Sequence, residues 1–208
     1  MTFASIVWDV DPVLVHLGSL EIRWYGLMWG LGFILAYEMV SRLFKKEGYP
    51  ENWADKLFVY CIVSSVIGAR LGHCLFYEWD YYSVHPAEIL KIWKGGLASH
   101  GGVFAIILAL VWYSKKVTKK SVWWLFDRMI PAVAVVCFCI RFGNLMNSEI
   151  YGYPTTLPWG FEFVRSREWH QLYEGLPCHP TQIYEMLYCL VAGVTAWVMY
   201  HKYHLQNR

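Results

Sequence analysis

An arginine, two asparagines and a glutamate lie close together in RFGNLMNSEIYG, which follows the uncharged stretch PAVAVVCFCI. Arg141, Asn144 and Ser148 recur in it at spacings of three and four residues, so they share one face of a helix that Asn147 borders. Arginine offers a planar fork of donors that suits phosphate, and amides add directional donors and acceptors. The alternative is that Arg141 pairs with Glu149 or extends to the membrane interface.

A second cluster is KGGLASHGG, in which four glycines surround His100. Glycine costs up to about 1 kcal/mol in a helix interior, so this run indicates an interrupted helix start or a close backbone approach. Irregular backbone at membrane depth must be covered by protein or line a water-filled cavity, and we expect His100 to face that cavity. Histidine exchanges protons near neutral pH. The alternative is a hydrogen-bonded interfacial histidine.

Two more polar clusters open apolar segments. In CHPTQIYE, Gln182 and Glu185 are three residues apart and face together, with Tyr184 to one side. In RWYGLMWG, Tyr25 has the amphipathic character of an interfacial belt residue and could also move a proton. Arg70 places a further charge inside an apolar segment, where charges are costly and therefore functional candidates.

The sequence segments that carry these clusters are predicted to be membrane-spanning helices. Hydrophobic residues make up 57% of the chain and charged residues 16%, against about 25% charged in soluble domains. Soluble helices keep a polar face, which FVYCIVSSVIGA and GGVFAIILALVWY lack. Two glycine pairs at i, i+4 suit close helix packing, Gly26 with Gly30 and Gly68 with Gly72. We predict an all-α, polytopic membrane protein, a single integral-membrane domain over 1–208, with five spans at about 24–43, 57–77, 97–114, 122–147 and 181–201.

Basic residues in the short connections predict the orientation. Ten lie on one side: Arg42, Lys45, Lys46, Lys56, Lys115, Lys116, Lys119, Lys120, Lys202 and Arg208. Five lie on the other: Arg23, Lys91, Lys94, Arg165 and Arg167. The first side is therefore expected in the cytoplasm, with the N-terminus outside and the C-terminus of this chain inside. The long aromatic loop at about 148–180 is expected to form an ordered cap on the outer, periplasmic side.

All four polar clusters then fall at the outer ends of their spans. Together they predict a polar chamber walled by apolar helices, which suits an anionic lipid headgroup whose tails stay in the bilayer. A transporter or a lipid-binding protein without chemistry is the alternative from another class. Transport requires polar residues along a path to both faces, and the inner halves of these spans are apolar.

The clusters together resemble a known family, the bacterial prolipoprotein diacylglyceryl transferases. The stretch with WYGL resembles the family's opening, GARLGHCLFY its second-span segment, and GGLASHGG its H-G-G motif. RFGNLMNSEIYG is similar to the signature R-x-G-N-x-x-N-x-E-x-x-G, and HPTQIYE to H-P-[ST]-Q-x-Y-E. The resemblance runs through essentially the whole chain, and the motifs in this order are highly specific.

The resemblance implies a reaction and roles for these residues. The family moves a diacylglyceryl group from phosphatidylglycerol to the lipobox cysteine thiol of prolipoprotein signal peptides, in the bacterial inner membrane. Residues at functionally required family positions are Tyr25, His100, Arg141, Asn144, Glu149 and Gly152, with Asn147 also expected to bind phosphatidylglycerol and Gln182, Tyr184 and Glu185 in support. Arg141 would hold phosphate, and His100 is favoured as the base with Tyr25 as its partner. The family implies no metal, no organic cofactor and no nucleic-acid partner.

Several positions depart from the family pattern. Ser148 and Ile140 replace glycines of the signature, and Cys178 stands where many members have arginine. Family members have seven spans, and the later ones carry a second arginine and a glutamate of the site. The resemblance therefore implies a truncated chain, or a substitute cation in Arg70 or Arg165. A third reading is that the chain is an inactive fragment of the transferase.

Overall fold

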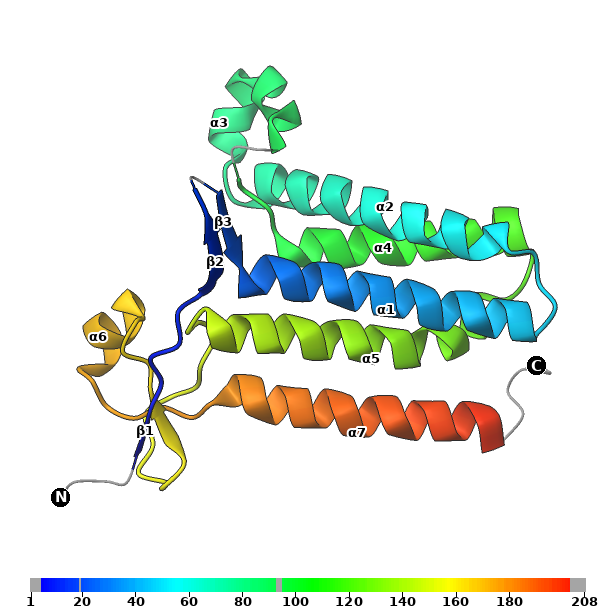
Figure 1. Cartoon of the computed structure of the whole chain (residues 1–208). Helices are drawn as coiled ribbons and strands as arrows, with labels where there is room; N and C mark the ends of the chain where they lie inside the picture. Colours follow the sequence, from blue (N-terminus) through cyan, green and yellow to red (C-terminus); the bar gives the residue numbers. More distant parts are fainter. Residues whose placement is uncertain (1–4, 19, 93–94, 203–208) are drawn as a thin grey trace. The chain divides into compact units, whose positions relative to one another are not determined.

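The computed structural model describes residues 5–18, 20–92 and 95–202 (Figure 1). Within that part, five helices are long and apolar enough to cross a membrane. They are α1 (Trp24–Lys46), α2 (Asn52–Phe76), α4 (Ser99–Tyr113) with the π-helical continuation η3 (Ser114–Thr118), α5 (Val122–Met146) and α7 (Thr181–Lys202). The predicted all-α, polytopic architecture is confirmed. Lys94 and Arg208, used in the orientation argument, lie outside the described residues.

Short elements that were not predicted from the sequence lie before and between these helices. Three are helical and four are strands, and none exceeds seven residues, too few for a clear periodicity. Strand β1 pairs in parallel with β4, and β2 forms an antiparallel hairpin with β3. The bounds are β1 (Ser5–Val7), β2 (Val13–Leu17), β3 (Leu20–Arg23), α3 (Trp79–Val84), η1 (Pro86–Leu90), β4 (Gly160–Glu162) and α6 (Arg167–Tyr173).

The chain divides into two compact units, which we describe separately. Among the described residues, the first unit comprises 5–39 and 129–202, and the second comprises 40–128. The first contains most of α1 and α5 together with α7, α6 and the four strands. The second contains α2, α3, η1 and α4. The single integral-membrane domain expected from the sequence stays a prediction.

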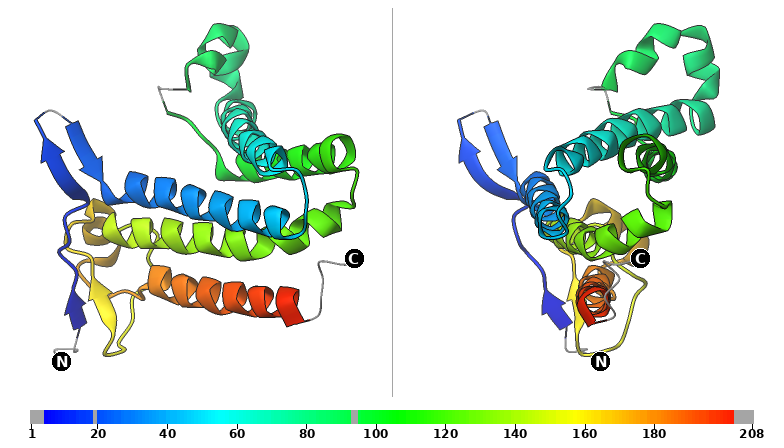
Figure 2. Two further views of the ribbon diagram at one scale, coloured as in Figure 1. Left: turned by 45° about the vertical axis from the view of Figure 1, so that its right-hand side comes forward. Right: turned by 90° about the vertical axis from the view of Figure 1, so that its right-hand side faces the viewer.

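Small residues bring the helices of the first unit together. A Cβ on Gly32 of α1 would lie 3.2 Å from the Cβ of Cys139 on α5. A Cβ on Gly193 of α7 would lie 3.0 Å from the Cβ of Ala134 on α5. Helices in lipid associate through such close packing, because hydrocarbon gives no hydrophobic drive between them. The result is a row in which α5 lies between α1 and α7 (Figure 2).

The segment 148–180, called the cap segment below, folds around its own aromatic core. Phe161, Phe163, Trp169 and Cys178 are buried there, and Leu145 of α5 and Met186 of α7 complete the cluster. The indole of Trp169 donates to the carbonyl of Leu176 at 2.8 Å, which satisfies its buried polar atom. The cap segment is thereby packed onto the ends of α5 and α7 that carry the polar signature residues.

Glycines set the packing of α2 against α4 in the second unit. A Cβ on Gly68 would clash with Ala105 and the carbonyl of Gly101, and a Cβ on Gly72 would lie 2.8 Å from the Cα of Gly101. The packing role expected for Gly68 and Gly72 is therefore present. In contrast, a Cβ on Gly30 meets no described atom of its own unit within 4 Å, so the role expected for that position is not seen there.

Replacing Gly68 with leucine should separate α2 from α4 and lower the unfolding temperature in detergent. The cost of forcing a side chain into such a contact is about 1–3 kcal/mol. Circular dichroism during heating measures the change. The matched control is Gly30→Leu, which adds the same side chain to a membrane helix at an open position. Equal unfolding temperatures for the two variants would contradict the close packing of α2 and α4.

A buried ion pair stabilises the opposite end of the second unit. Arg128 and Glu47 are paired at 2.8 Å, with Arg128 fully buried. The guanidinium also donates to the carbonyl of Trp124 at 2.8 Å and lies 4.0 Å from the centre of its ring. Hydrogen bonds to a buried pair offset its desolvation, and those of Arg128 do so here, whereas Oε1 of Glu47 has no hydrogen-bond partner among the described residues. Neither partner is among the functional candidates predicted from the sequence.

Candidate functional site

The polar signature residues form one connected network at the end of α5. Nη1 of Arg141 donates to Oδ1 of Asn144 at 3.2 Å, and Nδ2 of Asn144 donates to Oε1 of Glu149 at 2.8 Å. Asn147 donates to the same carboxylate oxygen at 3.3 Å. Nε of Arg141 pairs with Oε2 of Glu185 on α7. These five side chains, with Gln182, are called the Arg141 network.

The partner of Arg141 differs from the one considered in the sequence analysis. Glu149 was the expected alternative partner, but its carboxylate is held by the two asparagines. Glu185 pairs with the arginine instead, from a different helix. Sequence spacing cannot reveal this contact, because it depends on how α7 packs beside α5. The only available signal was that Glu185 is acidic at the start of an apolar span.

Three buried acceptors of this region have no hydrogen-bond partner among the described residues. They are Oδ1 of Asn147, Oγ of Ser148 and Oε1 of Gln182. Gln182 is fully buried, and its Nε2 donates to the backbone carbonyl of Glu149 at 2.7 Å. Buried polar atoms are nearly always hydrogen-bonded, so unpaired acceptors indicate that a donor such as a hydroxyl or a water belongs here.

The backbone after α5 turns through the left-handed region at Ser148, where the resemblance implies a glycine. Ser148 has φ 52° and Ile150 has φ 60°, both in the left-handed region. Glycine adopts that region without a steric cost, whereas other residues are strained there. The amide of Glu149 donates to the carbonyl of Asn144 at 3.1 Å, which turns the chain back toward the helix end. This turn brings the Glu149 carboxylate within reach of both asparagines.

Gly152 has a role in packing. Its amide donates to the carbonyl of His179 at 2.9 Å, joining the start of the cap segment to its end. A Cβ at this position would lie 2.8 Å from Cγ2 of Thr181 and 3.0 Å from the Cβ of His179. Only glycine allows the two strands of chain to approach this closely. Gly152 therefore helps to position Glu149, which lies three residues before it, and Gln182, which lies three residues after His179.

Tyr25 lies against the same end of α5. A Cβ on Gly143 would lie 2.8 Å from Cδ2 of Tyr25 and 3.1 Å from its Cα. Gly143 precedes Asn144, so the absence of a side chain there lets the start of α1 approach the Arg141 network. The ring of Tyr25 packs edge-on to Trp29 at 6.3 Å between centroids. The first unit thus brings Tyr25, Arg141, Asn144, Asn147, Glu149, Gln182 and Glu185 to one end of its helices.

His100 belongs to the second unit, in the first turn of α4. Its exposed ring lies 6.0 Å from Phe76 and 5.6 Å from Tyr77, measured between centroids. Gly95 and Gly96 have φ of 86° and 71°, and Gly101 touches α2, so the glycine run supplies both features expected of it. The joint action of His100 with Arg141 stays a prediction.

Arg70 is buried and holds the connection that precedes α4. Its guanidinium donates to the backbone carbonyls of Glu88, Ile89, Gly95 and Gly96 at 2.6–3.1 Å. It also lies 5.0 Å from the ring centre of Tyr82. Four carbonyl partners and an aromatic ring favour a structural role over that of a second cation.

Arg165 is the other candidate for a second cation, and it joins the cap segment to the N-terminal segment. Its Nε lies 2.6 Å from Asp9 and its Nη1 3.1 Å from Asp11. The amide of Val13 and the guanidinium of Arg165 lower the pKa of the Asp11 carboxyl. The hydrogen bond that Arg165 donates to the Asp9 carboxylate raises the pKa of Arg165. Arg165 is thus already paired with two exposed carboxylates. Its contacts give no support to the idea that it serves as the second cation of the site.

Tyr184, in the first turn of α7, and Cys178, at the end of the cap segment, both have their contacts in the cap segment. Tyr184 accepts a hydrogen bond from the indole of Trp159 at 2.9 Å, and its hydroxyl lies 3.1 Å from Nδ1 of His179. It therefore points away from the Arg141 network. Cys178 is fully buried, and burial raises the pKa of its thiol, which favours the unreactive neutral form.

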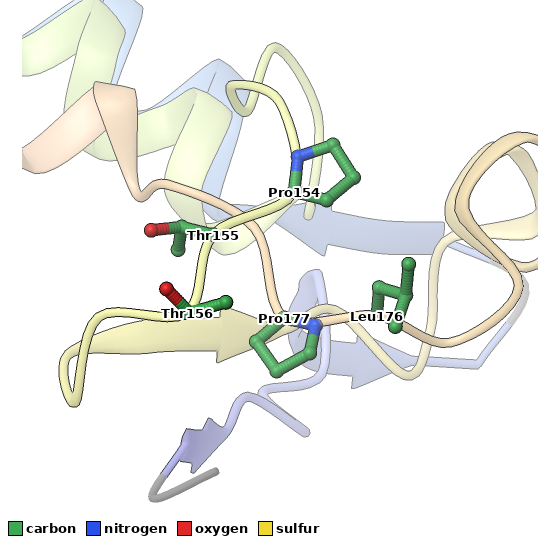
Figure 3. A pocket seen from close by; sticks show the side chains of 5 residues that line it. All are labelled: Pro154, Thr155, Thr156, Leu176 and Pro177. Carbon is green, nitrogen blue, oxygen red and sulfur yellow. The ribbon is translucent and has the colours of Figure 1, made fainter.

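A concavity of about 330 Å³ lies in the cap segment (Figure 3), and no side chain of the Arg141 network lines it. Two extended stretches line it, with Pro154, Thr155 and Thr156 on one and Leu176 and Pro177 on the other. None of these five side chains is ionisable. The described part of the chain also contains no group of three or more metal-ligating side chains. The Arg141 network is therefore the better candidate for chemistry.

Comparisons with known proteins agree on one family. The family model described as prolipoprotein diacylglyceryl transferase matches residues 12–208. A protein of Porphyromonas gingivalis is 46% identical over 203 residues, covering 96% of this chain and 72% of that protein. A protein of Chloroherpeton thalassium is 45% identical over 193 residues, covering 92% and 69%. A third, from Tolumonas auensis, is 44% identical over 181 residues, covering 86% and 67%. All three are named phosphatidylglycerol–prolipoprotein diacylglyceryl transferase.

Proposed function

The chain belongs to the prolipoprotein diacylglyceryl transferase family, and from that premise we propose that it transfers a diacylglyceryl group from phosphatidylglycerol to the lipobox cysteine of prolipoproteins. The thiol loses its proton, and the sulfur attacks the glyceryl carbon bonded to the phosphate oxygen. A carbon–sulfur bond forms as the carbon–oxygen bond breaks. Glycerol phosphate leaves, and the product is a thioether.

The observation that carries this proposal is the Arg141 network itself. Arg141 keeps a side-chain exposure of 29%, while Asn144, which orients it, is 2% exposed. A fixed, accessible guanidinium beside apolar helices suits the phosphate of a lipid whose tails remain in the membrane. Positive charge held in place there also stabilises the developing charge on the departing phosphate.

The unpaired acceptors near Glu149 support recognition of the glycerol headgroup. Oδ1 of Asn147 and Oε1 of Gln182 are buried without partners among the described residues. The hydroxyls of the phosphatidylglycerol headgroup are donors that would satisfy them. Unpaired buried acceptors penalise a ligand lacking those hydroxyls, because the acceptors stay desolvated.

His100 and Tyr25 are the groups proposed to handle the proton. The thiolate is the nucleophile, so a base must act before the carbon–sulfur bond forms. His100 has the residue type that accepts protons near neutral pH, and it is exposed at the start of α4. Tyr25 packs against the backbone beside Asn144 and is proposed as its partner.

The direct test is a transfer assay with the purified chain. Nanodiscs containing phosphatidylglycerol would be mixed with a lipobox peptide, and mass spectrometry would detect the diacylglyceryl thioether. A peptide with serine in place of the cysteine controls for the nucleophile, and phosphatidylethanolamine nanodiscs control for the donor. Binding of phosphatidylglycerol without any thioether would favour lipid binding without chemistry.

Five membrane-crossing helices make this a multi-pass membrane protein, and we propose the bacterial inner membrane with the N-terminus outside and Lys202 in the cytoplasm. Lys119→Cys and Glu168→Cys, both at exposed positions, test that orientation. An impermeant thiol reagent applied to intact cells should label only position 168. Permeabilised cells should label both positions, which shows that each cysteine is reactive. Labelling at 119 in intact cells would reverse the orientation.

A further inference from the structure

An apolar groove of about 300 Å³ lies between α5 and α7 in the first unit. Its lining includes Pro131, Ala134 and Phe138 on α5, and Gly193, Val194 and Trp197 on α7. We call it the α5–α7 groove. None of its lining residues is charged, and the thiol of Cys189 and the indole N–H of Trp197 are the polar side-chain groups among them.

The floor of the groove is formed by small residues and its sides by large ones. Gly193 and Ala134 bring the two helix backbones close together, since a Cβ on Gly193 would lie 3.0 Å from that of Ala134. Phe138 and Trp197, which are 36% and 39% exposed, also line the groove. The sequence pattern therefore builds a concavity where two larger residues would have filled the space.

The groove begins one helical turn from the Arg141 network. Phe138 precedes Arg141 by three residues, and Cys189 follows Glu185 by four, so each lies on the same helix face as its polar neighbour. Pro131, at the far end, is ten residues from Arg141. That separation is about 15 Å along a helix at 1.5 Å per residue. It is about half of a hydrocarbon core roughly 30 Å thick, the depth of one leaflet.

We propose that the α5–α7 groove holds one acyl chain of the lipid whose phosphate is bound at Arg141. This inference rests on the proposed function, since it assigns a place to part of the same donor. The occupant is hydrocarbon, because the lining of the groove is apolar and its depth matches one leaflet. Surrounding lipid is as apolar as the lining, so the groove contributes shape and alignment rather than hydrophobic energy.

Alignment has a consequence for the choice of donor. An acyl chain seated along α5 and α7 fixes the rotation of the glyceryl unit, and with it the carbon that the thiolate attacks. Small misplacements of reacting atoms cost large factors in rate. A long acyl chain should therefore fill the groove along its length. A short acyl chain should fill only the end near the Arg141 network, at Phe138 and Cys189.

Val194→Phe tests this inference. Val194 is 56% exposed and lines the groove nine residues beyond Glu185, so a phenyl ring fits there and obstructs the lower part. Transfer from dipalmitoyl phosphatidylglycerol should fall by about tenfold, whereas transfer from the dioctanoyl lipid should stay near that of the unchanged chain. The control is Val191→Phe, the same substitution on the same helix at a 66% exposed position outside the groove lining.

Equal losses with both lipids, or an equal selectivity change in the control, would overturn the groove assignment. A second measurement does not depend on a variant: phosphatidylglycerol with a diazirine near the end of one acyl chain should crosslink to residues 131–138 and 193–197. A chain that transfers the lipid but crosslinks elsewhere also overturns the assignment. No thioether with either lipid would instead contradict the proposed function, so the two failures are distinguishable.

Discussion

Diacylglyceryl transfer should fall by about 100- to 1,000-fold when Arg141 is replaced by lysine, the range for losing one donor that stabilises charge in a transition state. Lysine keeps the positive charge but lacks the planar fork. In the structure, that fork faces Glu185 through Nε and Asn144 through Nη1 at the same time. An ammonium on a flexible stem cannot keep both partners and also hold two phosphate oxygens. The transfer assay with purified variants measures the loss.

The matched control is Arg165→Lys. Arg165 is also an arginine paired with carboxylates, but its partners Asp9 and Asp11 are exposed, and its side chain is 40% exposed. Exposed ion pairs contribute little, so this variant should keep near-normal transfer. If Arg141→Lys were also near normal, the arginine would be acting as an interfacial charge, and the phosphate role would lose its support.

Asn144→Asp should reduce transfer by about 100-fold and also lower the unfolding temperature. Asn144 is 2% exposed, and its Nδ2 donates to Glu149 at 2.8 Å. The substitution replaces that donor with a carboxylate oxygen facing another carboxylate. Asn144 is buried and Glu149 is half-buried, so the loss of this donor leaves a desolvated carboxylate without its hydrogen bond, which costs about 2 kcal/mol or more. Transfer assays and thermal unfolding in detergent would measure the two effects.

A second substitution shows whether the effect of Asn144→Asp comes from losing the hydrogen bond between residues 144 and 149 or from disturbed packing around position 144. In the Asn144→Asp, Glu149→Gln double variant, the new amide at position 149 can donate to the new carboxylate at position 144. The unfolding temperature should then recover most of its loss, since the bond is restored with its direction reversed. If the double variant is no more stable than Asn144→Asp alone, the contact between these two side chains does not have the assigned geometry.

The headgroup and the acyl chain of the donor lipid are proposed to bind at different places, so the two binding sites can be tested separately. Arg141 and the buried acceptors of Asn147 and Gln182 are proposed to bind its headgroup, and the α5–α7 groove is proposed to bind one acyl chain. Headgroup variants should affect all acyl lengths equally. Groove variants should affect long chains more than short ones. This difference allows each half of the donor site to be tested without the other.

The sequence by itself determined the membrane architecture and singled out all the residues that the structure joins in the Arg141 network. Five apolar spans were predicted within a few residues, because hydrophobicity over about 20 residues is a local property. The shared face of Arg141 and Asn144 followed from helical spacing alone. The glycine signal around His100 was also local, since the left-handed backbone of Gly95 and Gly96 depends on residue type.

Only the tertiary structure decided which side chains meet. Glu185 reaches Arg141, and Gln182 reaches the backbone of Glu149, because α7 packs beside α5. Arg70, a candidate cation by sequence, is bound by backbone carbonyls of its own connection. The α5–α7 groove exists because Gly193 meets Ala134 across two helices. Such contacts join residues tens of positions apart, and they depend on side-chain volume at a crossing point, which spacing along one helix does not encode.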